Sequence, residues 1–240
     1  MSGASPRAEA SGTPAVSVLI PVYRSGDQAA EAVGRILGVL EGVERVEVIL
    51  CDDGSPDDSL AQIESLRSGS AAAPIRVLSH PNRGLGFTLT RLIREARGEA
   101  CVYLDMDLSF DVSRLPRLLE LLSDHDIVVA SRYSGATPSG VPAGRRICSR
   151  AYRGLVFLLT GTDIVDIGSG MVAFRRERVR ALGLASEGFN IHAELFDKAR
   201  RAGLAIRVEP VPYVHAPGSF RPLRHGALVV RDLVLYRLNR

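Results

Sequence analysis

The chain has 240 residues, of which 46% are apolar and 24% are charged. A chain of this size and composition can bury the core of one large domain or two small ones, which excludes a disordered polypeptide. Its net charge is only +3 and its aromatic content is 5%. No basic motif is interleaved with aromatic residues, so nucleic-acid binding is not expected.

The N-terminal region and the cysteines bear on the location of the protein. Residues 1–15 lack an apolar core and predict a flexible tail rather than a signal peptide. No run reaches the roughly 18 apolar residues that a bilayer-spanning helix requires. Two of the three cysteines, Cys51 and Cys101, lie in apolar runs, as expected of buried thiols in a reducing compartment. These features predict a cytoplasmic protein.

The first half of the chain alternates between strand and helix patterns. Short apolar runs predict strands over residues 16–23, 46–55, 75–80 and 100–105. Apolar residues at helical spacing predict helices over residues 27–41, 57–66 and 87–96. This order is the repeating unit of a parallel sheet with crossover helices. We therefore expect a three-layer α/β fold with a mostly parallel central sheet flanked by helices.

The second half is less regular and carries no internal repeat. Its patterns predict helices over residues 115–122, 147–159 and 191–202. They predict strands over residues 126–133, 169–176 and 204–213. A loop rich in glycine and proline covers residues 134–144, and residues 226–240 form an amphipathic segment that carries arginines.

Two acids follow the strand predicted at residues 100–105, in the stretch CVYLDMDLSFD. Asp105 and Asp107 alternate, so both side chains can point the same way, while Met106 points back toward the core. In such sheets the ligand crevice borders the carboxyl ends of the strands. Two like charges there repel each other unless a cation lies between them, and Mg²⁺ or Mn²⁺ prefers such oxygen ligands. A solvated turn is the alternative, but the strand-end position favours a metal site. Asp111 is expected to cap the next helix.

A second group of acids follows the strand predicted at residues 46–55, in CDDGSPDDS. Asp57 or Ser55 is suited to cap the next helix. Asp52 and Asp53 come where the strand leaves the sheet, and an acid there can accept hydrogen bonds from a nucleobase or a ribose. The turn NRGLG lacks the third glycine of a dinucleotide fingerprint, and there is no P-loop. The pattern therefore disfavours a dehydrogenase or a nucleoside triphosphatase.

The motifs around these residues occur in an order typical of one family. They are IPVYRS, ILCDDGSPDDS, NRGLG, YLDMDLSFD, VVASRY, VDIGSGMVAFRR and PYVHAPGSF. In this order the chain resembles the family 2 glycosyltransferases, and within them the branch of dolichyl-phosphate mannose synthases and polyprenyl-phosphate glycosyltransferases. The resemblance extends from about Val16 to Arg221. It implies a GT-A fold, a GDP- or UDP-sugar as donor, and Mg²⁺ or Mn²⁺ as the cofactor.

The resemblance also implies roles for particular residues. Those expected to line the nucleoside, the diphosphate and its metal are Pro21, Tyr23, Asp53, Asp105, Met106, Asp107, Arg132, Ser219 and Arg221, with Asp105 and Asp107 as metal ligands. Those expected to act in catalysis are Asp107, Arg132, Asp166 and Glu194. Residues 16–240 would then form one domain after a tail at 1–15. Its parts would be a nucleotide-binding half at 16–107, an acceptor-side half at 108–225 and an amphipathic C-terminal helix at 226–240.

The chain departs from the family pattern in several places. Arg24 and Ser25 stand where Asn-Glu is common, Ser109 where a Gln or His often follows the metal acids, and His215 where an arginine is common. We do not expect the membrane-spanning tail of many relatives here, and the amphipathic C-terminal helix would be its only substitute. The base and the sugar of the donor therefore stay open.

The reaction implied is transfer of a sugar, with inversion, to a polyprenyl or dolichyl phosphate. Such an acceptor is already anionic, whereas a hydroxyl acceptor would need Asp166 or Glu194 to take its proton. A structural role stays open for both acids, in a turn and on a solvated helix face. Transfer to a soluble hydroxyl acceptor is the alternative. A sugar nucleotidyltransferase lacks support because its glycine-rich loop is absent, and a non-catalytic binding module would not need the intact acid pair.

An arginine cluster precedes an apolar stretch in the second half. Its members are Arg145, Arg146, Arg150 and Arg153, followed by apolar residues at 155–159. A solvated charged face is one explanation. The other is a site for the acceptor phosphate or for an anionic membrane, which would place a cytoplasmic protein at the inner face of the membrane.

Overall fold

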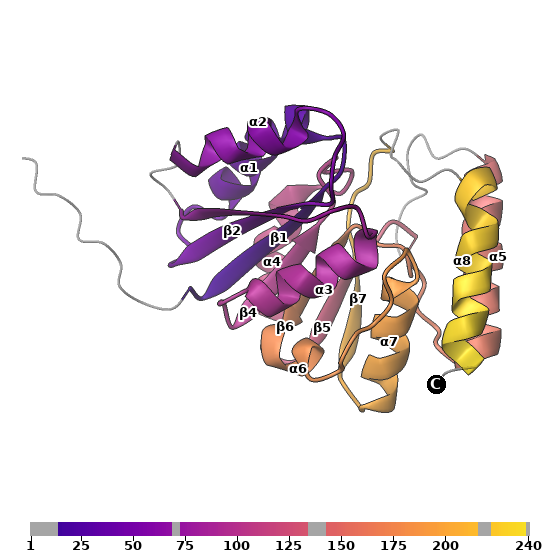
Figure 1. Ribbon diagram of the computed structural model, residues 1–240. Helices are drawn as coiled ribbons and strands as arrows, with labels where there is room; N and C mark the ends of the chain where they lie inside the picture. The colour runs from indigo at the N-terminus through magenta and orange to yellow at the C-terminus, as the bar shows by residue number, and fades with distance from the viewer. Residues whose placement is uncertain (1–13, 69–72, 134–142, 216–221, 239–240) are drawn as a thin grey trace, which may run out of the picture.

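The computed structural model describes residues 14–68, 73–133, 143–215 and 222–238, and a seven-stranded sheet runs through its centre (Figure 1). The strands are β1 (Val16–Val22), β2 (Val46–Asp52), β3 (Ile75–Ser79), β4 (Ala100–Leu104), β5 (Ile127–Ser131), β6 (Met171–Arg175) and β7 (Ile206–Pro210). Their order across the sheet is β3-β2-β1-β4-β6-β5-β7.

Helices cover both faces of this sheet. The α-helices are α1 (Ala29–Val39), α2 (Ser59–Ser65), α3 (Leu85–Glu95), α4 (Leu115–Leu121), α5 (Ala143–Thr160), α6 (Arg176–Arg180), α7 (Ile191–Arg201) and α8 (Pro222–Leu238). Short 3₁₀ turns are η1 (Gly26–Gln28), η2 (Leu66–Ser68) and η3 (Val112–Arg114). Residues of α1, α2 and α4 pack in the core on one face, and residues of α3, α5, α6, α7 and α8 pack on the other. The three layers that the sequence predicts are present.

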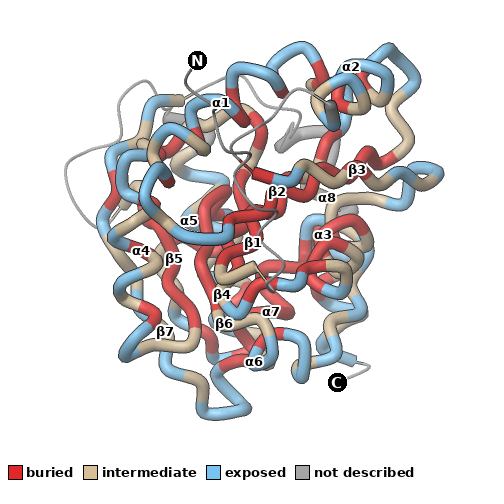
Figure 2. Tube along the Cα trace, turned by 90° about the vertical axis from the view of Figure 1, so that its left-hand side faces the viewer, coloured by how far each residue is buried: buried red, intermediate tan, exposed pale blue. Residues whose placement is uncertain are grey.

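The central strands are buried on both faces, which explains their continuous apolar runs. In β1, Val18 and Ile20 face one core and Leu19 faces the other, all with no exposed surface. Figure 2 shows these strands as buried segments in the middle of the molecule, enclosed by more exposed helices and turns.

Strand β6 runs against its neighbours. It pairs antiparallel with β4 and β5, whereas the other neighbouring strands pair in parallel. Met171 at the start of β6 therefore lies beside Leu104 at the end of β4. The segment before β6 thus reaches the edge where the parallel strands end. The sequence predicts the strand but not its direction, and the short helix α6 directly after it was not predicted.

Two glycines explain where elements begin and end near this edge. Gly54 has a φ of +64° and passes close to the main chain of Asn82, so β2 ends at Asp52 and not at the predicted residue 55. Gly84 has a φ of +97° and is followed by α3, which begins at Leu85, two residues before the predicted start. Helix α5 begins at Ala143, inside the loop predicted at 134–144; the rest of that loop lies outside the described residues.

Asp111 caps a helical turn as predicted, whereas the N-cap residue of α2 is Asp58, and Asp57 contributes a hydrogen bond from one position earlier. Asp111 Oδ1 accepts a hydrogen bond of 3.0 Å from the amide of Ser113 at the start of η3. Asp57 Oδ1 accepts one of 3.1 Å from the amide of Ser59 at the start of α2. Both carboxylates satisfy amides that the first helical turn leaves without a partner.

Helices α5 and α8 lie side by side at one end of the molecule (Figure 1). Among the described residues, no helix combines the length and the apolar character that crossing a bilayer requires.

Candidate active site

The acids after β4 border a small cavity of about 60 Å³ at the edge where that strand ends. Asp105, Asp107, Ser109 and Arg132 contribute to its lining, together with glycines from the segment before β6. Met106, between the acids, is 6% exposed and packs in the core. The two carboxylates thus face the cavity and Met106 faces the core, as the sequence predicts, although β4 ends at Leu104 and Met106 and Asp107 lie in the turn that follows it.

Asp105 is held from two sides. The hydroxyl of the buried Tyr103 donates a hydrogen bond to Asp105 Oδ1. Burial, followed by the charge of Asp105, raises the pKa of Tyr103 well above its usual value, so the phenol remains a donor. On the other side a Cβ at Gly170 would overlap the Asp105 carboxylate, and the carbonyl of Gly170 accepts the Asp105 amide at 2.8 Å. The carboxylate has little room to move.

The turn after Asp105 fixes Asp107. Leu108 has a φ of +43°, a conformation that non-glycine residues rarely adopt. The Leu108 amide donates to the Asp105 carbonyl at 3.2 Å, and the Ser109 amide donates to Asp107 Oδ1 at 3.0 Å. The Ser109 hydroxyl is buried and has no hydrogen-bond partner among the described residues. A buried oxygen of this kind calls for a ligand or water in the cavity.

These oxygen atoms suit a hard divalent cation. The described parts of the chain hold no group of three or more His, Cys, Asp or Glu side chains placed to bind a metal, so the two acids cannot enclose a cation by themselves. Mg²⁺ commonly uses one or two protein carboxylates and takes its remaining oxygens from phosphate and water. Asp105 and Asp107, with the unpartnered Ser109 hydroxyl in the same lining, fit that arrangement.

Arg132 and Asp166 form a buried ion pair at this cavity. Nε and Nη2 of Arg132 donate to the two Asp166 carboxylate oxygens at 2.8 and 3.0 Å, and the Arg132 amide adds a bond of 3.0 Å. Nη2 also donates to the Gly168 carbonyl at 2.7 Å. Burial disfavours the charged guanidinium, but Asp166 outweighs it and raises the pKa of Arg132 further. Arg132 is therefore a fixed positive charge, and the Asp166 carboxylate is engaged in holding it.

Asp53 organises the turn NRGLG beside the ends of β1 and β2. Its carboxylate accepts hydrogen bonds from the amides of Arg83 at 2.8 Å and Gly84 at 3.0 Å. Pro21 lies within β1 and Tyr23 directly follows it, with 39% of Tyr23 exposed. The ends of β1 and β2 thus bring Pro21, Tyr23 and Asp53 to the sheet edge at which Asp105 stands; β1 is the neighbour of β4, and β2 lies one strand further away.

Glu194 is buried in the first turn of α7 and does not line the cavity. Its carboxylate accepts hydrogen bonds from the amides of Ala185 at 2.9 Å and Ser186 at 2.7 Å, and it pairs with Lys198 at 2.6 Å. Burial opposes its charge, but the bonds from Lys198 and Ser186 outweigh burial and lower the pKa of Glu194. The residue is 1% exposed, so the solvated helix face considered from the sequence is not what the structure shows.

Comparison with known proteins identifies the family. A family model described as "Glycosyl transferase family 2" matches residues 17–183, which include the acid pair, Arg132 and Asp166. The chain belongs to glycosyl transferase family 2.

Similar proteins support the branch of the family that the motifs indicate. The chain is 31% identical over 203 residues to the dolichol-phosphate mannosyltransferase of Pyrococcus furiosus, covering 82% of this chain and 55% of that protein. It is 27% identical over 210 residues to an undecaprenyl-phosphate 4-deoxy-4-formamido-L-arabinose transferase of Pseudomonas savastanoi, covering 87% and 61%. The chain thus spans a little over half the length of these two relatives.

Solved structures of similar fold support the GT-A architecture of this glycosyl transferase family 2 chain. Glucosyl-3-phosphoglycerate synthase from Mycobacterium tuberculosis, crystallised with Mn²⁺, UDP-glucose and phosphoglyceric acid, superposes with a TM-score of 0.70 at 24% identity, covering 95% of this chain and 79% of that chain. Mannosyl-3-phosphoglycerate synthase from Rubrobacter xylanophilus gives a TM-score of 0.71 at 18% identity, covering 94% and 74%. The three-layer GT-A fold expected from the sequence is confirmed.

Two of the predicted site residues cannot be located in the described structure, and three residues found at the site were not predicted from the sequence. Ser219 and Arg221, expected in a loop over the donor, lie outside the described residues. Tyr103, Gly170 and Tyr213 were not predicted as parts of the site. For Tyr103 a signal was available, because strand alternation places it on the same face as Asp105 two residues later. For Gly170 and Tyr213 it was not, because their place depends on strand pairing and on a distant loop.

Proposed function

We propose that the chain is a metal-dependent, inverting glycosyltransferase that moves a sugar from a nucleoside-diphosphate sugar to a polyprenyl phosphate. The observation that carries this proposal is the clamped pair Asp105 and Asp107 beside the fixed charge of Arg132, in one cavity of a glycosyl transferase family 2 chain.

Asp105 and Asp107 would hold Mg²⁺ or Mn²⁺ on the donor diphosphate. A cation bound there neutralises the negative charge that develops on the departing nucleoside diphosphate. The mycobacterial structure of similar fold contains UDP-glucose together with Mn²⁺, which supports a nucleoside-diphosphate sugar with a divalent cation here. Pro21, Tyr23 and Asp53 would border the nucleoside, Asp53 doing so through the amides of the turn that it fixes.

The state of the two candidate bases supports an anionic acceptor. Asp166 is engaged by Arg132, and Glu194 by two amides and Lys198. Neither carboxylate is arranged to take a proton from a hydroxyl, whereas a phosphate oxygen attacks without a base. A bond forms from that oxygen to the anomeric carbon as the bond from this carbon to the donor diphosphate breaks. Arg132 would face the phosphates, Asp166 would position Arg132, and Glu194 would position the loop before α7.

The pair of helices α5 and α8 supports contact with the membrane that holds such an acceptor. Their exposed large apolar side chains are Ile147, Phe157, Leu158, Val230, Val234, Leu235 and Leu238. Arg150, Arg231 and Arg237 are exposed on the same two helices. Apolar and basic side chains together suit the interface of an anionic bilayer. We propose that the protein binds the cytoplasmic face of the membrane. In a flotation assay, the wild-type protein should rise with anionic vesicles. The double variant Leu158→Asp/Leu235→Asp should not bind the vesicles and should stay at the bottom of the gradient.

The acceptor is tested by product analysis. Wild-type protein with Mn²⁺ and UDP- or GDP-sugars is offered polyprenyl phosphate and, separately, phosphoglyceric acid as a soluble acceptor that carries a hydroxyl. The proposal predicts a sugar-phosphate-lipid product of inverted anomeric configuration. Strict preference for the soluble acceptor would overturn the acceptor assignment while leaving the glycosyltransferase activity in place.

A further inference from the structure

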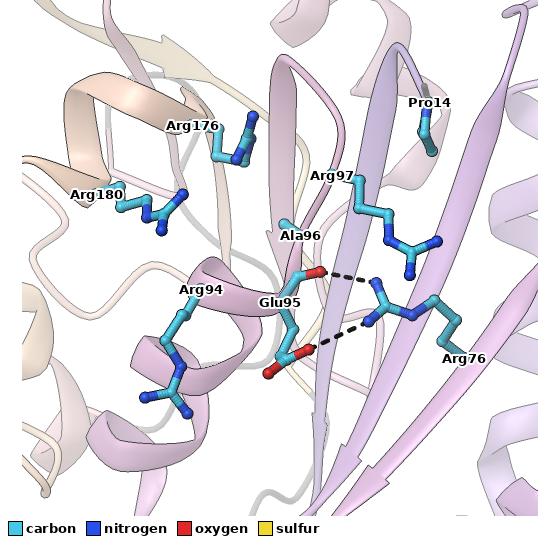
Figure 3. A pocket seen from close by; sticks show the side chains of 8 residues that line it. All are labelled: Pro14, Arg76, Arg94, Glu95, Ala96, Arg97, Arg176 and Arg180. Carbon is cyan, nitrogen blue, oxygen red and sulfur yellow. Dashed lines mark hydrogen bonds and ion pairs between the residues drawn. The ribbon is translucent and has the colours of Figure 1, made fainter. Parts of the chain in front are cut away.

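A second concave site lies at the opposite edge of the sheet from the acid pair. It is a depression of about 560 Å³, and its charged lining is Arg76, Arg94, Glu95, Arg97, Arg176 and Arg180. Arg76 stands near the start of β3, the turn at Arg97 leads into β4, and Arg176 follows the antiparallel β6. Figure 3 shows Arg76 and Arg97 on one side of the depression, and Arg94, Arg176 and Arg180 on the other.

The side with Arg76 and Arg97 is built on a buried carboxylate. Glu47 in β2 is 1% exposed. It accepts hydrogen bonds from the Ser17 hydroxyl at 2.5 Å, from Arg76 Nη1 at 3.2 Å and from the amide of Arg97 at 2.8 Å. Arg76 also donates to the main-chain carbonyl of Glu95 at 2.7 Å and to its carboxylate at 3.3 Å. These contacts fix Arg76 and the main chain of Arg97.

The turn that carries Arg97 is packed directly on β1. A Cβ at Gly98 would lie 2.6 Å from the amide nitrogen of Ser17, so only glycine fits there. The Gly98 amide donates to the Ser17 hydroxyl at 2.8 Å, and the Gly98 carbonyl accepts from Arg176 Nε at 2.8 Å. The same turn therefore anchors the Arg176 guanidinium on one side of the depression and fixes the main chain of Arg97 on the other.

Positive charge exceeds negative charge in this depression. Glu47 and Glu95 are engaged by Arg76, and Glu177 lies 2.9 Å from Arg176 and 3.8 Å from Arg180. The exposed side chains of Arg94 and Arg97 have no acidic partner among the described residues. Guanidinium groups gathered in this way repel one another unless an anion lies between them, and their planar donors match phosphate oxygens.

We propose that this depression is a binding site for a small oligophosphate anion of the pyrophosphate type, separate from the donor site. Its size lies within the roughly 300–1,000 Å³ of ligand pockets. Among the described residues, the other members of the lining are Pro14 and Ala96, and these offer neither an aromatic ring to stack a nucleobase nor an apolar wall to hold a lipid chain. The charge and shape of the lining fit a compact anion better than a nucleotide or a lipid.

The site is tested by titrating pyrophosphate into the protein by calorimetry, with a chelator present so that no metal can hold the anion at Asp105 and Asp107. Wild type should show saturable binding. The double variant Arg94→Ala/Arg97→Ala should bind at least about tenfold more weakly, because it loses two charged donors. The matched control Arg117→Ala/Arg207→Ala removes the same charge from exposed positions elsewhere and should bind as wild type does.

Several outcomes would overturn the site. They are no pyrophosphate binding by wild type, equal weakening in both double variants, or full displacement of pyrophosphate by UDP, which would place the anion at the donor site. Phosphatidylglycerol vesicles run in parallel present the same phosphate chemistry as a headgroup. Arginine-dependent binding of vesicles without binding of pyrophosphate would contradict a soluble ligand. If the alanine variant does not fold, Arg94→Gln/Arg97→Gln makes the same comparison with the aliphatic part of each side chain largely retained.

Discussion

Replacing Tyr103 by phenylalanine removes one hydroxyl from beside Asp105, the acid proposed to bind the metal, and leaves the buried ring in place. That hydroxyl donates to Asp105 Oδ1, and a hydrogen bond to a charged group contributes roughly 1.5–3 kcal/mol. Asp105 itself is only half-buried, so water can replace part of the loss and the lower end of the range applies. We therefore expect the Kd for Mn²⁺ to rise about tenfold. This is the lower end of the loss of metal affinity seen when a residue hydrogen-bonded to a metal ligand is replaced.

The assay is a titration of Mn²⁺ in the presence of UDP, with free Mn²⁺ measured by electron paramagnetic resonance. Transfer activity should recover at saturating Mn²⁺, because the variant alters metal affinity more than the chemical step. Tyr152→Phe is the matched control, since it also removes a hydroxyl from a hydrogen bond, here one of 3.0 Å to Asn190. Unchanged Mn²⁺ affinity in Tyr103→Phe, or an equal loss in Tyr152→Phe, would refute the reasoning.

Three further predictions follow from the same contacts. Gly170→Ala should cost at least about 100-fold in transfer rate, because the new methyl group overlaps the carboxylate that it faces. The control Gly34→Ala adds a methyl group in α1, away from the cavity and with no atom within 4 Å of the added Cβ, and should keep its activity. Equal rates for the two variants would contradict this. Arg132→Lys keeps the charge but loses the bidentate hydrogen bonding to Asp166. The value of kcat/KM for polyprenyl phosphate should therefore fall about tenfold or more. An unchanged kcat/KM would exclude a role of this ion pair in the reaction. Burial lowers the pKa of His192 to about 4. Below pH 6.5 this histidine is therefore protonated in the unfolded chain but not in the folded chain. The free energy of unfolding, measured by thermal unfolding, should fall by roughly 3 kcal/mol between pH 6.5 and 4. The His192→Gln variant should lack this part of the slope, and a slope equal to that of wild type would rule the histidine out.

Local patterns carried most of the fold and the centre of the site. The alternation of Asp105, Met106 and Asp107 after an apolar run predicted two carboxylates at the sheet edge and one side chain in the core, and both are found. The cap at Asp111 was equally local. In each case the deciding pattern lies within a few residues, so the sequence alone contains the information.

Contacts between distant segments could not be predicted in this way. Asp166 is engaged by Arg132 across 34 residues, and that pairing exists because β6 runs antiparallel and returns the segment before it to the sheet edge. From the sequence, Glu194 was interpreted as a catalytic acid or as part of a solvated helix face. Its carboxylate instead accepts hydrogen bonds from two main-chain amides of the loop before α7. Such roles depend on which main-chain groups are left unpaired in the folded chain, and residue type does not reveal that.

The most direct test of the central claim compares two aspartates four residues apart. Asp107 borders the cavity, whereas Asp111 caps a 3₁₀ turn. Transfer of labelled sugar from a UDP- or GDP-sugar to polyprenyl phosphate is measured with Mn²⁺ for wild type, Asp107→Asn and Asp111→Asn. If the acid pair holds the metal on the donor, Asp107→Asn should lose at least about 100-fold in rate and Asp111→Asn should stay close to wild type. Equal rates for wild type and Asp107→Asn would contradict the account.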